Sequence, residues 1–149
     1  MAQPSLQPQR TPDKQRTTPT PVHTLARLAV DAALDKKAKD VTVLDMRKVS
    51  GVADIFVLCN GDTDIQVRAI AQSVRMKIKE ACDELPWHSE GLDSLQWVLL
   101  DYVDLVVHVF QPEKRDFYSL ERLWGDAERE DVPDDASGSE VVLLRDEGT

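Results

Sequence analysis

The sequence lacks several features that would place its function at once. Its 149 residues hold two cysteines and no CxxC pair, which excludes a disulfide framework. No apolar run approaches the roughly 18 residues of a membrane span, and the N-terminus has no apolar signal-peptide core. We therefore expect a cytoplasmic protein that makes no membrane contact, with Cys59 and Cys82 as reduced, buried thiols.

The common catalytic signatures are also missing. There is no GxSxG, no P-loop and no GxGxxG. The side chains that could ligate a metal lack any HxxxH-type regularity: these are His88, Glu90, Asp101 and His108. The sequence therefore predicts neither a metal site nor a cofactor, and we expect a protein that is not an enzyme.

Two groups of residues could carry chemistry, but residues of these kinds more often have a structural role. Asp45 and Asp54 could form a general acid/base pair, although carboxylates commonly stand at strand ends. The turn 60–63 precedes a helix and could hold an anion on its backbone amides, but Asp62 and Asp64 would repel one. Capping of the helix by Thr63 and Gln66 is the favoured interpretation of this turn.

The net charge of −9 is unevenly distributed. The last 24 residues hold nine acidic and two basic side chains, whereas residues 25–125 are close to neutral. A body without a clustered basic surface is not expected to contact nucleic acid directly. Acidic groups favour a basic protein partner instead.

Hydrophobic periodicity predicts one α/β (α+β) domain at residues 23–127, with a mixed sheet of about five strands and flanking helices. Residues 1–22 and the acidic residues 128–149 are predicted to be disordered, and the run 141–144 is taken as a tail segment. In chain order the expected elements are a helix from Thr24 to the lysines at 36–39, strands at 41–46 and 54–59, a helix from Thr63, an irregular edge strand at 86–91, a hairpin at 97–110 and a helix from Pro112.

The hairpin at 97–110 carries the most informative pattern. A two-residue loop at Tyr102 and Val103 would place Trp97 opposite His108 and Asp101 opposite Asp104. One face would then be wholly aliphatic: Val98, Leu100, Leu105, Val107 and Val109. The other face would mix apolar and polar groups: Trp97, Leu99, Asp101, Asp104, Val106, His108 and Phe110.

The mixed face has two interpretations of equal weight on the residues alone. An aromatic anchor, an aliphatic floor and an acidic rim have the composition of a hot spot for a partner rich in Lys and Arg. A helix of the same chain covering Trp97 and His108 would account for the pattern equally well.

Several segments together resemble the ribosomal silencing factor family, also called Iojap-like. The segments that carry this resemblance are Ala53-Asp54-Ile55-Phe56-Val57-Leu58, Asn60-Gly61, Gln66-Val67-Arg68-Ala69-Ile70-Ala71, Glu90-Gly91, Trp97-Val98-Leu99-Leu100-Asp101-Tyr102, Asp104-Leu105-Val106-Val107-His108-Val109-Phe110 and Arg115-Asp116-Phe117-Tyr118-Ser119-Leu120-Glu121-Arg122-Leu123-Trp124. The resemblance runs from about residue 25 to residue 127, in the family's order and spacing.

The resemblance implies a nucleotidyltransferase-like fold without catalytic residues and a non-enzymatic translation repressor. Family members bind the large ribosomal subunit through its universal ribosomal protein fourteen, and they block subunit joining when nutrients are short or in stationary phase. The partner-binding residues it implies for this chain are Trp97, Leu99, Asp101, His108, Arg115, Tyr118 and Glu121. With the resemblance included, the interface interpretation of the mixed face is favoured.

The sequence departs from the family's pattern in the hairpin loop and before the long helix. Val103 stands where the family usually has Gly, so a tight loop is disfavoured and a wider one is expected. Thr63 and Ile65 stand where Ser and Arg are common. Two alternative hypotheses are consistent with the sequence. The first is a nucleotide-binding protein or nucleotidyltransferase-like enzyme that uses Asp45, Asp54 and the turn 60–63. The second is a homodimer of the free protein that forms through the mixed face.

Overall fold

The computed structural model describes residues 20–49, 51, 53–118 and 120–145. The predictions for residues 1–19 lie outside this range. Within the described part of the chain, no helix is long and apolar enough to cross a membrane.

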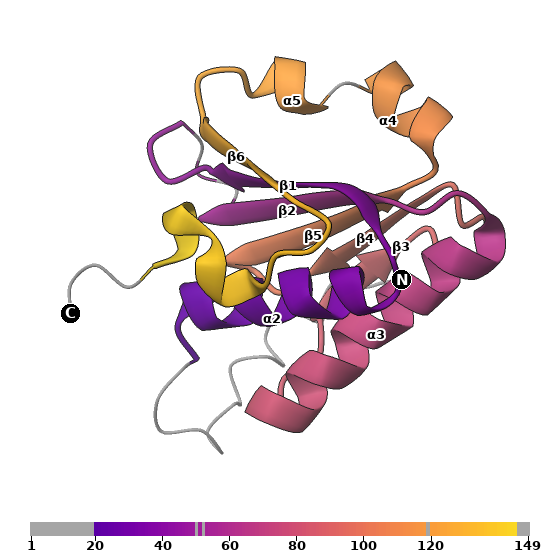
Figure 1. Cartoon of the computed structure of the whole chain (residues 1–149), viewed down its shortest axis with the longest axis horizontal. Helices are drawn as coiled ribbons and strands as arrows, with labels where there is room; N and C mark the ends of the chain where they lie inside the picture. Colours follow the sequence, from indigo (N-terminus) through magenta and orange to yellow (C-terminus); the bar gives the residue numbers. More distant parts are fainter. Residues whose placement is uncertain (1–19, 50, 52, 119, 146–149) are drawn as a thin grey trace.

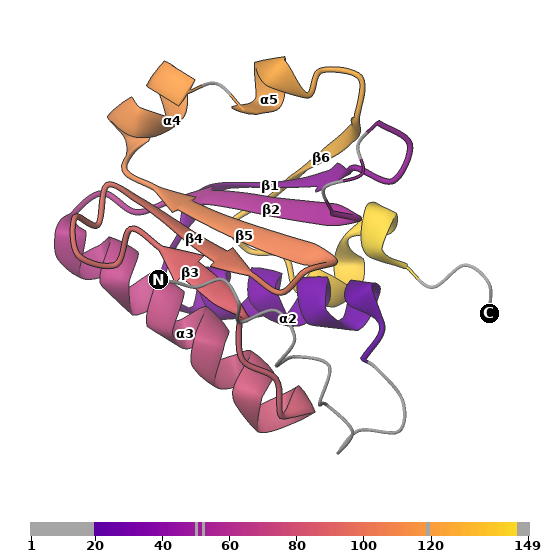
Figure 2. The same cartoon turned by 180° about the vertical axis from the view of Figure 1, so that it is seen from behind.

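A six-stranded mixed sheet organises the domain. Its strand order is β3-β4-β5-β2-β1-β6, and only β2 and β5 run parallel. The elements in chain order are α2 (Val22–Asp35), β1 (Lys39–Asp45), β2 (Ile55–Asn60), α3 (Asp64–Cys82), β3 (His88–Glu90), β4 (Trp97–Asp101), β5 (Leu105–Phe110), α4 (Pro112–Tyr118), α5 (Leu120–Leu123), β6 (Glu128–Val132) and the short 3-10 helices η3 (Gly138–Glu140) and η4 (Val142–Leu144). The long helices α2 and α3 lie on one side of the sheet and the short helices α4 and α5 on the other (Figures 1 and 2). The predicted mixed α+β fold is therefore confirmed, with one strand more than expected.

The main core lies between the sheet and the two long helices. The aliphatic face predicted for the hairpin is confirmed, because Val98, Leu100, Leu105, Val107 and Val109 are all buried in this core. The Cys59 thiol also lies there, and burial raises its pKa to about 12. A thiol that stays protonated at neutral pH is a poor nucleophile and a poor metal ligand.

The predicted register of the hairpin is wrong by two residues. Trp97 pairs with Phe110 and Leu99 with His108, so that Asp101 faces Val106 rather than Asp104. A shift of two residues keeps every side chain on its predicted face, whereas a shift of one would have exchanged the faces. The predicted face of each hairpin side chain is therefore correct. The repulsion expected between Asp101 and Asp104 does not arise, because the two residues are not paired.

The register shift widens the loop around Val103, as the departure from the family pattern suggested. Val103 has φ +78°, and the backbone N–H of Asp104 donates to the Tyr102 carbonyl at 3.0 Å, which gives a γ-turn centred on Val103. The Asp101 carboxylate accepts from the backbone N–H of Val103 at 2.7 Å and steadies the loop. A β-branched residue at positive φ is strained, by roughly 1–3 kcal/mol.

Replacing Val103 with glycine should therefore stabilise the domain. Glycine removes the strain but adds backbone entropy to the unfolded chain, so the net gain is expected to be about 1 kcal/mol. Urea denaturation followed by circular dichroism would measure it. Because the Val103 side chain is 38% exposed, little packing is lost, and a destabilised variant would contradict the proposed strain.

The predicted capping of the longest helix is confirmed and extends further than expected. The Thr63 hydroxyl accepts from the backbone N–H of Gln66 at 3.1 Å, and the side-chain Oε1 of Gln66 accepts from the backbone N–H of Asp62 at 2.7 Å. The Gln66 amide nitrogen in turn donates to the carbonyls of Lys36 and Lys37, at the end of α2. One side chain thus caps the start of α3 and joins it to the end of α2.

The prediction of a disordered acidic tail from residue 128 is wrong within the described residues. Residues 128–132 form β6, which pairs antiparallel with β1 along its whole length. The following segment crosses to α2, where Val141 and Leu144 are buried in the main core. We call residues 133–145 the C-terminal strap.

Specific polar contacts hold the C-terminal strap against its neighbours. Glu130 accepts from the backbone N–H groups of Val142 and Leu143, at 3.0 and 2.9 Å, and so caps the start of η4. Asp31 of α2 accepts from the backbone N–H of Gly138 at 2.6 Å. Glu130, which lies in the segment predicted to be a disordered acidic tail, therefore binds backbone amides of the strap, and Asp31 of α2 does the same.

Candidate functional site

The second face of the sheet carries a smaller, aromatic core. Its buried members are Leu44, Met46, Ala53, Phe56, Leu58, Val106 and Phe110. Trp97 and Leu99, both on β4, pack against it while remaining half-exposed. We call the half-exposed side of β4 formed by Trp97, Leu99 and Asp101 the β4 surface.

Trp97 is held in one orientation by the groups beneath it. Its ring stacks on Phe110 with 5.2 Å between centroids, and its indole N–H donates to Nδ1 of His108 at 3.1 Å. His108 itself packs edge-on against Phe56 at 4.8 Å. A Trp fixed by stacking and by a hydrogen bond loses little side-chain entropy when a partner covers it.

His108 lies too deep to be a direct contact. It is 4% exposed, and burial lowers its pKa to about 3. Because Nδ1 accepts from Trp97, the neutral ring carries its proton on Nε2, which has no hydrogen-bond partner among the described residues. His108 is therefore a neutral support for Trp97 at physiological pH.

The buried His108 predicts a loss of stability in mild acid. The imidazole of an unfolded chain takes up a proton near pH 6.5, while the folded one does so only near pH 3, so unfolding takes up a proton between these values. The free energy of unfolding should consequently fall as the pH falls through this window, by about 2 kcal/mol between pH 7 and pH 5.

Urea denaturation of the wild type and of His108→Phe at both pH values would measure this term. The variant keeps an aromatic ring in the cluster but has no proton to bind. We expect its decrease between pH 7 and pH 5 to be smaller than that of the wild type by about 2 kcal/mol. Equal decreases in the two proteins would contradict a neutral, buried His108.

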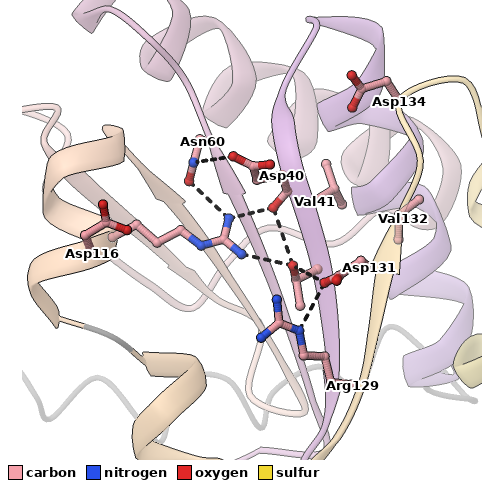
Figure 3. Close-up of a pocket in the computed structure, with 10 residues that line it drawn as sticks. Asp40, Val41, Asn60, Asp116, Arg129, Asp131, Val132 and Asp134 are labelled. Carbon is pink, nitrogen blue, oxygen red and sulfur yellow. Dashed lines mark hydrogen bonds and ion pairs between the residues drawn. The ribbon is translucent and has the colours of Figure 1, made fainter.

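Arg115 is also buried, and its predicted role as an exposed contact does not fit this position. It is 7% exposed and reaches from α4 down to the sheet. Its guanidinium donates to the Asp40 carbonyl at 2.6 Å, to Oδ1 of Asn60 at 3.1 Å and to the Thr42 hydroxyl at 2.9 Å (Figure 3). Arg115 thus fixes α4 to β1 and β2. Tyr118 and Glu121 were predicted as contacts on the same helical segment, but their side chains are not among those that the structure describes.

Little in the amino-acid sequence indicated this polar network. Thr42 and Asn60 each stand inside or at the end of an apolar strand, and such single polar residues are common in sheets. One pattern could have revealed it. Side chains alternate between the two faces of a strand, so Thr42 and Asn60 lie on the face that carries Leu44 and Leu58. Two buried polar side chains on one face require partners, and Arg115 supplies them.

Asp45 and the backbone amides of Gly61 and Asp62, which were considered for nucleotide chemistry, have partners within the domain, and Asp54 lies at the opposite end of β2 from the turn 60–63. Arg47 forms a bidentate pair with Asp45, at 3.0 and 2.7 Å, and this hydrogen bonding lowers the pKa of the Asp45 carboxyl. In the turn 60–63 the N–H of Gly61 donates to the Phe110 carbonyl, and that of Asp62 to Gln66. Among the described residues, no group of three His, Cys, Asp or Glu side chains is placed to hold a metal ion. The geometry therefore does not assemble the nucleotide site considered from the sequence.

Comparison with known proteins decides the family. The family model described as "Ribosomal silencing factor during starvation" matches residues 19–144, which include β6 and the C-terminal strap. The chain belongs to the ribosomal silencing factor family. It is 43% identical over 108 residues to the Bacillus subtilis ribosomal silencing factor RsfS, a match that covers 72% of this chain and 91% of that protein.

Other members extend this relationship to organelles and to solved structures. The chain is 32% identical over 104 residues to the chloroplastic protein Iojap of Zea mays, covering 70% of this chain and 45% of that one. A crystal structure of a Chromobacterium violaceum protein superposes with a TM-score of 0.68 at 40% identity, covering 71% of this chain and 88% of that one. A Bacillus halodurans structure gives 0.61 at 42% identity, with coverage of 68% and 93%. Two solved bacterial proteins at about 40% identity thus share the fold of this chain.

Proposed function

We propose that this ribosomal silencing factor binds the large ribosomal subunit through its universal ribosomal protein fourteen and sterically prevents the small subunit from joining. Family membership is the observation that carries the proposal. A mouse relative, 29% identical over 123 residues, bears the name "Mitochondrial assembly of ribosomal large subunit protein 1", which points to the same subunit. The protein would act in the cytoplasm as a translation repressor, without catalysis.

The β4 surface is the contact that we assign to this partner. Trp97 supplies a pre-oriented aromatic anchor, Leu99 a half-exposed aliphatic side chain and Asp101 a carboxylate. Aromatic anchors that are rigid and partly buried typically dominate binding energy, while charges at the rim act mainly on association rate and selectivity. A basic ribosomal protein matches this combination.

The remaining predicted residues take supporting or unassigned places in this proposal. His108 orients Trp97 from below, and Arg115 holds α4 over the sheet next to the aromatic core. Both act as positioning residues. Tyr118 and Glu121 remain proposed contacts from the end of α4 and from α5, without support from side-chain geometry.

Subunit joining provides the direct test. Purified large and small subunits are mixed at joining conditions with increasing amounts of the chain, and the joined fraction is read from sucrose gradients. We expect the joined fraction to fall while the chain migrates with the large subunit. Undiminished joining with the chain bound would reject the blockade, and failure to migrate with the large subunit would reject the partner.

A further inference from the structure

A polar cavity lies on the second face of the sheet, away from the β4 surface. It has a volume of about 310 Å³ and lies between α4, the start of β1 and the edge strand β6 (Figure 3). Its floor holds the buried polar side chains of Thr42, Asn60 and Arg115, which are 2%, 5% and 7% exposed. Buried polar groups that line an open cavity are unusual, because folding normally places them against protein atoms.

The rim of the cavity carries charges of both signs. Arg129 and Asp131 of β6 form an ion pair at 3.0 Å, and Asp131 also accepts from the Thr42 hydroxyl at 3.0 Å. The other charged groups of the lining are Asp40, Arg115, Asp116 and Asp134. The cavity is therefore lined by two guanidinium groups and four carboxylates, of which Asp134 is also paired with Lys39 at 3.6 Å.

Part of this bonding capacity is unused among the described residues. Arg129 engages Asp131 through Nε, which leaves the fork formed by its two Nη groups without a described partner. Asp131 accepts both of its hydrogen bonds on Oδ1, and Asp40 uses Oδ2 toward Asn60, so one carboxylate oxygen of each has no described partner. A guanidinium fork is suited to a carboxylate, and free carboxylate oxygens are suited to an ammonium group.

We propose that this cavity binds a free α-amino acid with a basic side chain, such as L-arginine or L-lysine. A simple anion would meet four carboxylates, and a simple cation would meet two guanidinium groups. A zwitterion can place its α-carboxylate on the Arg129 fork and its ammonium group on the carboxylate oxygens of Asp131 and Asp40. A basic side chain is favoured because carboxylates outnumber guanidinium groups in the lining.

The size of the cavity agrees with such a ligand. Liquid water occupies about 30 Å³ per molecule, so the cavity has room for roughly ten non-hydrogen atoms. That is the size of a single amino acid. The cavity shares no residue with the β4 surface, so this proposal does not depend on the proposed ribosomal contact.

Isothermal titration of the full chain tests the inference with identified probes. We expect saturable binding of L-arginine or L-lysine, with binding of L-glutamate, acetate and methylammonium weaker by about ten-fold or more. No saturable binding of either basic amino acid up to about 20 mM would overturn the proposal, as would equal binding of acetate or methylammonium.

Variants at the rim locate the ligand, and Asp131→Asn keeps a side-chain oxygen that can accept from the Thr42 hydroxyl of the floor. Arg129→Gln and Asp131→Asn should each weaken binding by about ten-fold. Arg47→Gln is the matched control, because Asp45 at the end of β1 and Arg47 in the following turn also form an ion pair two residues apart, and both lie outside the cavity lining. Binding that survives both rim variants, or that falls equally in the control, would place the ligand elsewhere and overturn the assignment.

Discussion

Alanine in place of Trp97 should weaken binding to the large ribosomal subunit by about 30-fold or more. The substitution removes the aromatic anchor of the β4 surface together with its stacking on Phe110 and its hydrogen bond to His108. Truncation of central aromatic anchors typically costs about 2–4 kcal/mol of binding free energy. Co-sedimentation with purified large subunits over a range of concentrations would give the change in Kd.

Two further variants separate loss of contact from loss of fold. Trp97→Phe retains a stacked ring but lacks the indole N–H, so its affinity should lie between those of the wild type and Trp97→Ala. Met76→Ala removes a 59% exposed apolar side chain from α3, on the opposite side of the sheet, and should bind like the wild type. If folded Trp97→Ala retained full affinity, the contact would not be at the β4 surface.

The second large effect is expected at Gly138, where the C-terminal strap meets α2. A Cβ atom at this position would lie 2.3 Å from the Arg27 carbonyl oxygen, a backbone atom that cannot move independently. Gly138→Ala should therefore displace the strap and expose Val141 and Leu144. The expected loss in the free energy of unfolding is about 3 kcal/mol or more, since full burial of one aliphatic side chain contributes about 1.5–3 kcal/mol.

Gly51→Ala is the matched control for this substitution. Apart from its chain neighbours, no heavy atom of the described residues lies within 4 Å of the Cβ that it would add, so its stability should stay within about 0.5 kcal/mol of the wild type. Urea denaturation of the three proteins would compare them directly. A Gly138→Ala variant as stable as the Gly51→Ala control would contradict the close packing of the strap on α2.

Local patterns predicted the centre of the fold well. Alternation in the hairpin assigned both faces of β4 and β5, because a side chain's face depends only on whether its position is odd or even. The exact partners depend on loop geometry, and the strained conformation of Val103 was not derivable from the pattern. The capping by Thr63 and Gln66 was readable because its partners are neighbours in sequence.

The end of the domain was mispredicted because the charged composition of residues 128–132 suggested disorder, although these residues form an edge strand. Residues 128–132 read Glu-Arg-Glu-Asp-Val, a segment with high charge and one aliphatic residue. Such a segment pairs with β1 only because it lies at the sheet's edge, where most of its side chains can stay in water. Acidic residues that bind backbone amides of distant segments, as Glu130 and Asp31 do, leave no local pattern to detect.

The positions of the exposed residues of the candidate site followed from the sequence, whereas the burial of His108 and Arg115 did not; that these residues bind a partner stays a prediction. Trp97, Leu99 and Asp101 lie together on β4, as expected for neighbours in one strand. His108 and Arg115 were assigned to the surface, whereas the structure buries both. Burial of a charged or titratable side chain depends on tertiary partners. The partners of Arg115 are distant in sequence: Asn60 precedes it by 55 positions and Thr42 by 73.

The outermost strands also determine how copies of this protein can meet. One edge of the sheet is β3, only three residues long, and the other is β6, which presents mostly charged side chains. Short or charged edges disfavour the addition of a foreign strand. Self-association would then have to use side-chain surfaces such as the half-exposed side of β4, so a homodimer and the ribosome would compete for the same residues.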